Sequence, residues 1–326
     1  MRIPQSLPRR ATDLSTTDHA ELSAVQPERG REYVQTRPAE FRGSIRERTG
    51  GGVGALQEFW SCALRVRCAR PRGYVAFAVI SSADPIDWCA TEVEEECVLE
   101  VGRDWELTTR GPAQVFSIAV DLALLEAVEA KLAGGQPSSP RDVNRVLRMP
   151  PDSEAGERIR SAVRCALDSR ALLPRAQRAL DDELLNTAVR IRRSGAEASS
   201  RAESWSRRRR AVRAVEEYLD AHEREVPSLA DLCAVAGVSE RTLEYAFLEQ
   251  LDTTPARYLR LRRLNRVRGE LLRADPGAVR VTEVAMRWGF WELGRFARDY
   301  RRLFGELPSQ TGPAPDRRTG SDEVSP

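Results

Sequence analysis

Short apolar runs separated by turn residues dominate the chain between about residue 41 and residue 120. Runs rich in β-branched and aromatic residues, such as 62–68, 74–80 and 114–120, are separated by turn signals that include Gly73 and Gly111. About six such strands at a spacing of roughly ten residues are typical of an antiparallel sandwich or barrel. This part of the chain is therefore predicted to form a small β domain.

The apolar period changes after residue 120 from two residues to about 3.6. Residues 121–132 form an amphipathic pattern that ends before Gly134, and residues 154–191 read as two further helices broken near Pro174. This change of period predicts helices that follow the β domain. Their apolar faces suit dimerisation or a contact with another part of the chain.

Residues 228–250 have a different construction, in which two short amphipathic segments meet at a glycine. Ser228 is placed to cap a first helix, the small pair Ala236-Gly237 allows a tight turn, and Ser239 is placed to cap a second helix. The second helix is expected to turn three residues inward, namely Leu243, Phe247 and Leu248. Two helices joined in this way match the helix-turn-helix pattern, although a single unit fits an ordinary helical hairpin equally well.

The same pattern recurs over residues 282–304, and the repeat favours the helix-turn-helix interpretation. Thr282 is predicted to cap the first helix of this unit and Gly289 to form its turn. The inward positions are expected to be Val284, Ala285, Leu293, Phe296, Tyr300 and Leu303. The segment 255–273 between the units has an apolar stripe at helical spacing and would span about 28 Å. A rod of that length could hold two recognition helices about one duplex turn apart, roughly 34 Å.

The composition excludes several classes of enzyme. Lys131 is the only lysine among 51 basic residues and follows no phosphate-binding loop, which excludes P-loop NTPases, kinases and Schiff-base enzymes. The only histidines are His19, in a polar tail, and His222, so neither a multi-histidine metal centre nor a histidine-activated nucleophile is expected in residues 37–204. We therefore expect no catalytic residues, no cofactor and no metal.

Cysteine usage and hydropathy indicate a cytoplasmic protein. The six cysteines are dispersed and form no C-x-x-C pair, as is typical of buried, reduced thiols. The longest apolar run, 74–80, is about a third of the ~20 residues that span a bilayer. No N-terminal segment has the apolar core of a signal peptide. We expect no membrane partner.

Basic charge is concentrated towards the C-terminus. Residues 205–312 hold 20 Arg and 16 acidic residues and so carry a net charge of +4, whereas the whole chain carries +2. The remainder of the chain is therefore mildly acidic. This asymmetry favours an anionic partner for the C-terminal block.

Residues 228–309 also contain motifs that go beyond the helical repeat. The first unit reads SLADLCAVAGVSERTLEYAF over 228–247, and TPARYLRLRRL follows over 254–264. A further signature comprises Gly289-Phe290, Phe296, Tyr300, Phe304-Gly305 and Pro308-Ser309. Together these motifs resemble the AraC/XylS family of transcriptional regulators. The resemblance implies a bacterial transcription factor and homodimer that binds double-stranded DNA through two units in successive major grooves and contacts RNA polymerase.

The resemblance also implies which residues contact DNA. In the first unit they are Arg241, Glu244 and Tyr245 at base edges, with Glu240 and Thr242 nearer the backbone; the capping residue Ser239 is a further DNA-binding candidate. In the second unit they are Leu293, Gly294, Arg295 and Arg298, with Arg301 at a phosphate. Leu293 and Gly294 depart from the polar residues often found in the family, so most base-specific energy is expected from the first unit. Trp291 has two interpretations, a wedge beside the core or a contact to the DNA backbone.

The N-terminal half resembles the family only in outline, because a small cupin-like β-barrel sensor followed by helices is the common plan. The candidate effector-binding residues are Trp60, Tyr74, Phe77, Trp88 and Trp105, with Phe116 as a further aromatic residue. Asp87 or the acidic run 92–96 could meet a cationic ligand. The alternative is that the aromatic residues form the core and the acidic residues are solvated.

The predicted fold class is α+β, with an antiparallel β-barrel-like sensor domain and following helices, then an all-α domain of two helix-turn-helix units joined by a long helix. The predicted boundaries are 1–36 for a disordered tail, 37–120 for the β-barrel-like regulatory domain, 121–198 for a helical dimerisation or interdomain segment, 199–206 for a linker, 207–312 for the DNA-binding domain and 313–326 for a second disordered tail. The alternative function is a small-molecule-binding or protein-interaction module whose helical repeat is only a scaffold.

Overall fold

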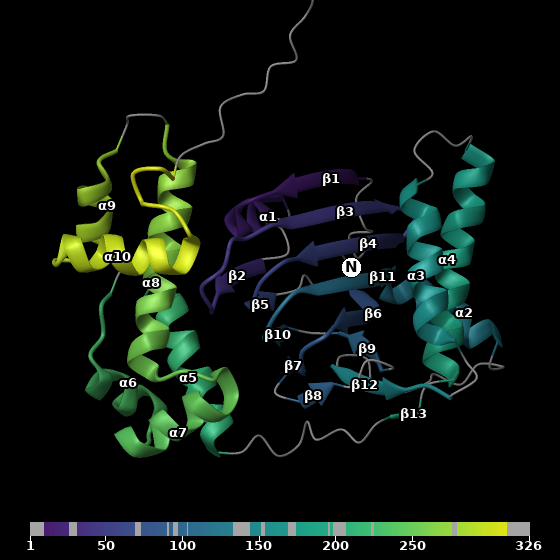
Figure 1. Ribbon diagram of the computed structural model, residues 1–326. Helices are drawn as coiled ribbons and strands as arrows, with labels where there is room; N and C mark the ends of the chain where they lie inside the picture. Colours follow the sequence, from purple (N-terminus) through teal and green to yellow (C-terminus); the bar gives the residue numbers. More distant parts are fainter. Residues whose placement is uncertain are drawn as a thin grey trace, which may run out of the picture.

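The structure is a computed structural model that describes most of the chain between residues 10 and 311. The described ranges are 10–25, 31–68, 73–89, 91–93, 97–102, 104–132, 144–150, 154–168, 174–194, 196–197, 207–222, 225–275 and 279–311. Within these ranges, two β-sheets and four helices form an N-terminal domain, and six helices form a C-terminal domain beside it (Figure 1). No helix in the described ranges is long and apolar enough to cross a bilayer.

The N-terminal domain contains a larger and a smaller antiparallel sheet. In spatial order, the described strands of the larger sheet are β1 (Arg10–Thr16), β3 (Gly43–Gly50), β4 (Val53–Trp60), β11 (Ala113–Asp121), β6 (Tyr74–Ser82), β9 (Val98–Val101), β12 (Arg145–Arg148) and β13 (Ala196–Glu197). Those of the smaller sheet are β2 (Arg31–Gln35), β5 (Leu64–Cys68), β10 (Trp105–Thr109), β7 (Ile86–Trp88) and β8 (Thr91–Val93). Neighbouring strands pair antiparallel throughout both sheets.

The central strands of the larger sheet carry two cores, because successive side chains of a strand point to opposite faces. On β11, Val115 and Ala119 pack into the space between the two sheets, whereas Phe116 and Ile118 pack against the opposite face. That outer face is covered by α2 (Leu122–Leu132), α3 (Ala155–Asp168) and α4 (Pro174–Ser194) (Figure 1). The prediction of an antiparallel β domain followed by helices is confirmed.

The structure differs from the predicted disordered tail over residues 1–36. β1 pairs with β3 along its whole length, α1 (His19–Val25) buries Leu22, and β2 forms one edge of the smaller sheet. The polar sequence of β1 is compatible with a strand because its side chains alternate between exposed and half-buried positions. The segment 121–198 is not wholly helical either, because β12 and β13 extend the larger sheet.

The C-terminal domain has two helical cores connected by one helix. Its elements are α5 (Arg207–Ala221), α6 (Leu229–Ala236), α7 (Glu240–Leu251), α8 (Pro255–Arg273), α9 (Val281–Arg287) and α10 (Leu293–Phe304). Phe247 and Tyr258 belong to the first core, and Phe296 and Tyr300 to the second. Because α8 contributes to both cores, the prediction of two units joined by a long helix is confirmed. The predicted linker 199–206 and tail 313–326 lie outside the described residues.

The outer face of the smaller sheet packs against α5 and α8 of the C-terminal domain (Figure 1). Arg65 on β5 lies between Glu216 of α5, at 2.5 Å, and Glu106 of β10, at 2.6 Å. The Tyr258 hydroxyl of α8 donates a 2.8 Å hydrogen bond to Glu216. Arg65 and Glu216 are both almost completely buried, so this contact joins the two domains through a desolvated ion pair.

Arginines on α8 extend the contact along β2 and α1. Arg266 pairs with Glu32 at 3.0 Å, and Arg268 pairs with Asp18 at 3.2 Å. The backbone N–H of Gln35 donates to the Asn265 side chain at 3.0 Å. The N-terminal domain thus occupies one side of α8, and the arginines on that side bind acidic residues of the same chain.

His19 lies fully buried in the same contact, with its ring 5.6 Å from Phe41 and 6.2 Å from Phe304 of α10. Burial lowers the pKa of His19 from 6.5 to about 4, opposed by the Asp18 carboxylate and assisted by Arg268. A base whose pKa is lowered on folding binds its proton more readily in the unfolded chain. The contribution of His19 to the free energy of unfolding should therefore be lost as the pH falls from 6.5 towards 4, by up to about 3 kcal/mol.

Urea unfolding at pH 7.5 and pH 5, monitored by tryptophan fluorescence, measures this loss. His19→Leu should remove much of the pH dependence, whereas His222→Leu, at the exposed second histidine, should leave it unchanged. Equal pH dependence in the two variants would contradict the assignment to His19.

Candidate nucleic-acid interface

The first helix-turn-helix unit has the caps that its sequence predicts. Ser228 accepts the backbone N–H of Asp231, and the Asp231 carboxylate accepts the backbone N–H of Ser228, which completes a capping box before α6. Gly237 ends α6 in a left-handed conformation, with φ of 61°. Ser239 accepts the backbone N–H of Thr242 at 3.3 Å and so fixes the start of α7. These local bonds determine the angle between α6 and α7.

α7 buries one stripe and exposes the predicted DNA contacts. Leu243, Ala246, Phe247 and Leu251 are buried. Ser239, Glu240, Arg241, Glu244 and Tyr245 are exposed, and Thr242 is half-buried. Leu248 is also exposed, so its predicted inward position is wrong. The buried stripe continues from Leu243 in steps of about one helical turn, and Leu248 lies outside that stripe.

The exposed arginine of α7 is supported by a neighbouring aromatic ring. The Arg241 guanidinium lies 5.5 Å from the centre of the Tyr245 ring and donates to the Tyr245 hydroxyl at 3.4 Å. The guanidinium of Arg208, on α5, lies 5.9 Å from the same ring. Such cation–π contacts restrict the side chain of Arg241 before any partner binds.

The second unit repeats the arrangement with different caps. Its turn is at Gly289, where φ is 76°. The prediction that Thr282 caps α9 is wrong, because α9 starts at Val281 and its N-cap, Arg280, makes no side-chain capping bond. α10 also lacks a side-chain cap. Packing of aromatic rings therefore contributes more here than capping does, with Phe296 5.0 Å from Phe290 and 5.7 Å from Tyr300.

α10 exposes most of its predicted DNA contacts. Gly294, Arg295, Arg298 and Arg301 are exposed. Leu293 is half-buried and packs against the second core. It was predicted both as an inward residue and as a DNA contact, and it fits each role only in part. Trp291 is 75% exposed, so its interpretation as a wedge beside the core is wrong. The other interpretation, a contact made at the surface, remains.

Comparisons with known proteins agree with this geometry. Residues 232–312 match a family described as a helix-turn-helix domain. Over 99 residues the chain is 44% identical to the probable thc operon regulatory protein of Rhodococcus erythropolis, and the match covers 30% of each protein. Over 97 residues it is 40% identical to XylDLEGF operon transcriptional activator 2 of Pseudomonas putida, and this match covers 30% of the chain and 62% of that protein. The chain thus spans less than two thirds of these relatives.

A solved structure of a probable AraC family transcriptional regulator from Rhodopseudomonas palustris CGA009 is 39% identical over 31% of this chain and 93% of that chain, with a TM-score of 0.29. The chain belongs to the AraC/XylS family through its C-terminal domain. The family match over residues 232–312 covers most of the double helix-turn-helix unit. The family match does not extend to the N-terminal domain.

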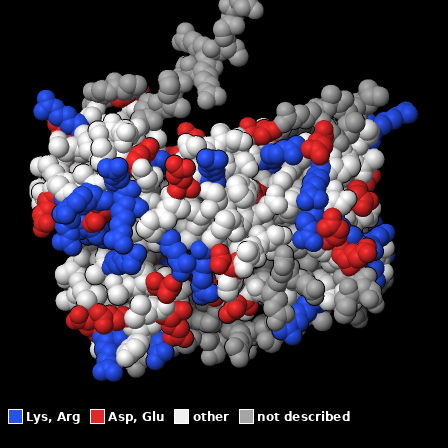
Figure 2. Space-filling model, viewed as in Figure 1, with Lys and Arg blue, Asp and Glu red and all other residues white. Residues whose placement is uncertain are grey.

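Arginines of the AraC/XylS domain divide into two groups. Basic side chains gather over α10 (Figure 2), where Arg295, Arg298, Arg301 and Arg302 are exposed. Several arginines elsewhere in the domain pair with acidic residues. Arg260 of α8 pairs with Asp299 at 2.5 Å, and Arg287 of α9 pairs with Glu270. Arg301 is therefore better placed than Arg287 for a phosphate contact.

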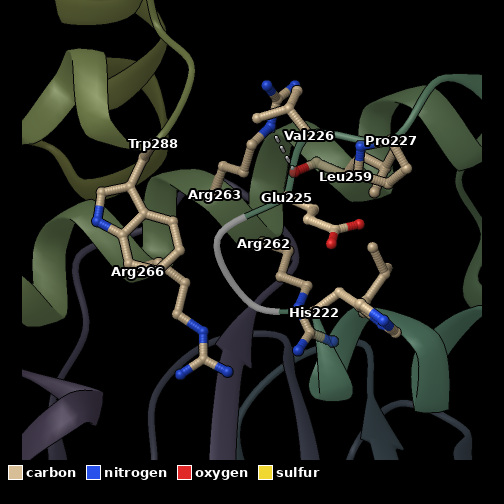
Figure 3. Close-up of a pocket in the computed structure, with 10 residues that line it drawn as sticks. His222, Glu225, Val226, Pro227, Leu259, Arg262, Arg263, Arg266 and Trp288 are labelled. Carbon is tan, nitrogen blue, oxygen red and sulfur yellow. Dashed lines mark hydrogen bonds between the residues drawn. The ribbon is translucent and has the colours of Figure 1, made fainter.

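A small crevice between α8 and residues 225–227 holds three further arginines (Figure 3). The guanidinium groups of Arg262, Arg263 and Arg266 point in different directions in Figure 3, so they do not converge on one anion. Arg262 and Arg266 are also paired with acidic residues. A side chain at Gly289 would approach Val226 to 2.8 Å, so the crevice is a close contact between the two units of the AraC/XylS domain.

The β domain has its own cavity, between the inner faces of its two sheets. Trp60, Trp88 and Trp105 line it, as the sequence predicts. Phe77 does not, because its side chain belongs to the opposite face of the larger sheet, under the helices, and the same holds for Phe116. Tyr74 is half-buried at the edge of the core and does not line the cavity. Asp87 pairs with Arg110 at 3.3 Å, and residues 94–96 of the acidic run lie outside the described residues.

Polar residues of the cavity were not predicted from the sequence. Arg31 of β2 pairs with Glu58 of β4 at 2.6 Å, and both are almost fully buried. The Tyr33 hydroxyl donates to Glu58 as well. Glu58 lies two residues from Leu56 and two from Trp60 on β4, so its side chain points to the same face as these apolar residues. This spacing is the one local signal that Glu58 faces inward.

Proposed function

We propose that the protein is a sequence-specific transcription regulator that places α7 and α10 in successive major grooves of promoter DNA. The observation that carries the proposal is the repeated unit, in which each of two packed helical cores presents one helix with at least one exposed arginine. The relatives are named as an operon regulatory protein and a transcriptional activator, which supports activation at promoters. Contact with RNA polymerase and assembly as a homodimer are parts of the proposal that follow from the family resemblance.

A footprint of the full chain on the DNA upstream of its own operon tests this function. We expect protection of two adjacent major grooves on one face of the duplex, about 34 Å apart. Raising the salt concentration should weaken the binding, because phosphate contacts release counterions. Absence of any protected site at moderate salt would favour the alternative, a binding module whose helical repeat is only a scaffold.

Arg241→Ala should weaken binding at one base position by about 1–3 kcal/mol and relax the sequence preference there. The Arg241 side chain is exposed and held by Tyr245, so the variant loses a base contact without disturbing a core. Competition gel shifts with single-base operator variants measure the effect.

Two other arginines provide matched controls for Arg241→Ala. Arg301→Ala should weaken binding to all operator variants about equally, because a phosphate contact carries no sequence information. Arg158→Ala, on the exposed face of α3 in the other domain, should change nothing. A uniform loss in Arg241→Ala would show that Arg241 contacts the backbone instead.

We propose further that the β domain makes the regulator responsive to a small molecule bound in the cavity between its sheets. The support is a cavity lined by three tryptophans, in the domain whose smaller sheet carries the contact to α5 and α8. A molecule that shifts the smaller sheet would alter the support of α8. Thermal-shift screening of the full chain against small molecules tests this part. Unchanged melting across the panel would leave the β domain as a dimerisation or docking module.

A further inference from the structure

The second helix-turn-helix unit exposes apolar surface where α10 begins. Trp291, which lies two residues before α10, is 75% exposed, more than any other large apolar side chain that the structure describes. Leu293, the first residue of α10, is half-buried, so that it packs against the second core and also reaches the surface. A single exposed apolar side chain needs no partner. The position of these two, at the end of α10 that carries the predicted DNA contacts, indicates one.

The next residue, Gly294, leaves the surface beside Leu293 open. Gly294 is exposed, and a Cβ atom added to it would meet no described atom within 4 Å. Its backbone does not adopt the left-handed conformation either. Neither packing nor conformation therefore requires a glycine here, although glycine is less favourable than alanine in a helix. The missing side chain lets an external surface approach the backbone of α10 closely.

Exposed cations adjoin this apolar surface. The Arg298 Nε atom donates to the backbone oxygen of Gly294 at 3.4 Å, which places the guanidinium beside the open surface. Arg295 lies 4.0 Å from Glu292, with side chains 58% and 77% exposed. Because water screens so exposed a pair, Arg295 is available to another anion. This charge complements a polyanion such as DNA better than it complements an apolar protein surface.

The first helix-turn-helix unit begins its exposed helix with different chemistry. The first three residues of α7 are Glu240, Arg241 and Thr242, which all carry hydrogen-bonding side chains. Such side chains bind the donors and acceptors of base edges, whereas the C5 methyl group of thymine is bound by apolar contact. Leu293 can bury that methyl group but can form no side-chain hydrogen bond with a base. The two units are therefore suited to different features of the major groove.

We infer that Trp291 and Leu293 select thymine in the half of the operator that α10 contacts, by burying thymine methyl groups against their side chains. Gly294 permits the close approach, and Arg295 and Arg298 make the neighbouring polar contacts. The inference rests on the proposed function, because it requires α10 to enter a major groove. It identifies the base that the second unit selects and the side chains that select it.

Replacement of thymine by uracil tests the inference, because it removes the methyl group and keeps the base pair. Gel-shift titrations of the full chain compare the footprinted operator with duplexes that carry uracil in one half or in the other. Loss of protection in Arg298→Ala identifies the half that α10 contacts. Uracil in that half should weaken binding about four-fold for each methyl group buried, and uracil in the other half should change it little. No loss in either half, or equal loss in both, would overturn the inference.

Two replacements connect the methyl effect to the named side chains. Trp291→Ala removes an exposed side chain and disturbs no core, so this variant alone should reduce the preference for thymine over uracil. Leu293→Gln keeps a stem that packs on the second core, and W291A/L293Q should abolish the preference. Arg298→Ala is the matched control, which should weaken binding to both duplexes and keep their ratio. An unchanged ratio in Trp291→Ala and W291A/L293Q would show that uracil acts through the shape of the duplex, and would overturn the inference.

The all-thymine duplex separates this inference from the proposed function. Failure of the wild-type chain to bind that duplex would count against the regulator itself. Normal binding without any response to uracil would overturn the methyl contact and leave the DNA-binding function intact. The exposed Trp291 would then be assigned to a protein partner such as RNA polymerase.

Discussion

Arg65→Ala should lower the free energy of unfolding by about 3–5 kcal/mol and release the C-terminal domain from the β domain. Arg65 is 1% exposed and lies between the carboxylates of Glu216 and Glu106, at 2.5 Å and 2.6 Å. Its removal leaves the Glu216 carboxylate of α5 buried without this partner. Among the described contacts of Glu216, the Tyr258 hydroxyl is then the one remaining hydrogen-bond donor. Urea unfolding measures the loss, and limited proteolysis of the native protein measures the release.

An exposed ion pair across the same contact provides the matched control. Arg37 and Asp252 also join the two domains, at 2.6 Å, but their side chains are 47% and 66% exposed. Because water screens this pair, Arg37→Ala should cost no more than about 1 kcal/mol. Similar losses for Arg37→Ala and Arg65→Ala would show that burial of the Arg65 pair does not determine the contact.

The loss in Arg65→Ala should also depend on pH. Burial raises the pKa of Glu216 to about 7, against the opposing charge of Arg65. Without that charge the pKa should rise further, so the folded variant binds a proton that the unfolded chain releases above about pH 4.3. Stability of the variant should therefore increase as the pH is lowered from 8 to 5.5, and more steeply than in the wild type.

The DNA-binding domain could be predicted from sequence because its signals are local. Helical period and a left-handed glycine lie within about twenty residues in each unit, with capping serines in the first, and short-range patterns of this kind define a helix-turn-helix. The errors are also local. Leu248 is apolar but lies off the buried stripe of α7, and Thr282 is one residue inside a helix that begins without a side-chain cap.

The N-terminal domain was harder to predict because its signals are non-local. β1 is polar and becomes a strand only by pairing with β3, more than thirty residues away in places. Phe77 and Trp88 look equivalent in the sequence, yet Phe77 packs on the outer face of the larger sheet and Trp88, on the smaller sheet, packs between the sheets. A strand buried on both faces shows no polar alternation that would reveal which face is inward.

The contact of β5 with α5 was not predicted, although the alternation in β5 contains a trace of it. Arg65 and Arg67 alternate with apolar residues of the interior, which predicts that both point outward. Only the structure shows that the outward face meets acidic residues of α5. Sequence position alone could not pair Arg65 with a carboxylate about 150 residues away.

Phe296→Ala should lower the free energy of unfolding by about 3–5 kcal/mol and erase one half of the DNA footprint. Phe296 is 2% exposed and packs between Phe290 and Tyr300 in a unit whose helices lack side-chain caps. The cavity left by the ring therefore weakens the main support of α10. Hydroxyl-radical footprinting on the full operator, together with urea unfolding, measures the two effects.

Phe247→Ala in the first unit is the counterpart of this change, since Phe247 is equally buried against Tyr258. It should erase the other half of the footprint and leave the protection of the groove that α10 contacts unchanged. Leu248→Ala, on the exposed side of α7, should cost no more than about 0.5 kcal/mol. If each unit occupies its own groove, the two phenylalanine variants must lose different halves. Loss of the same half in both variants would contradict the proposal that the two units bind the duplex independently.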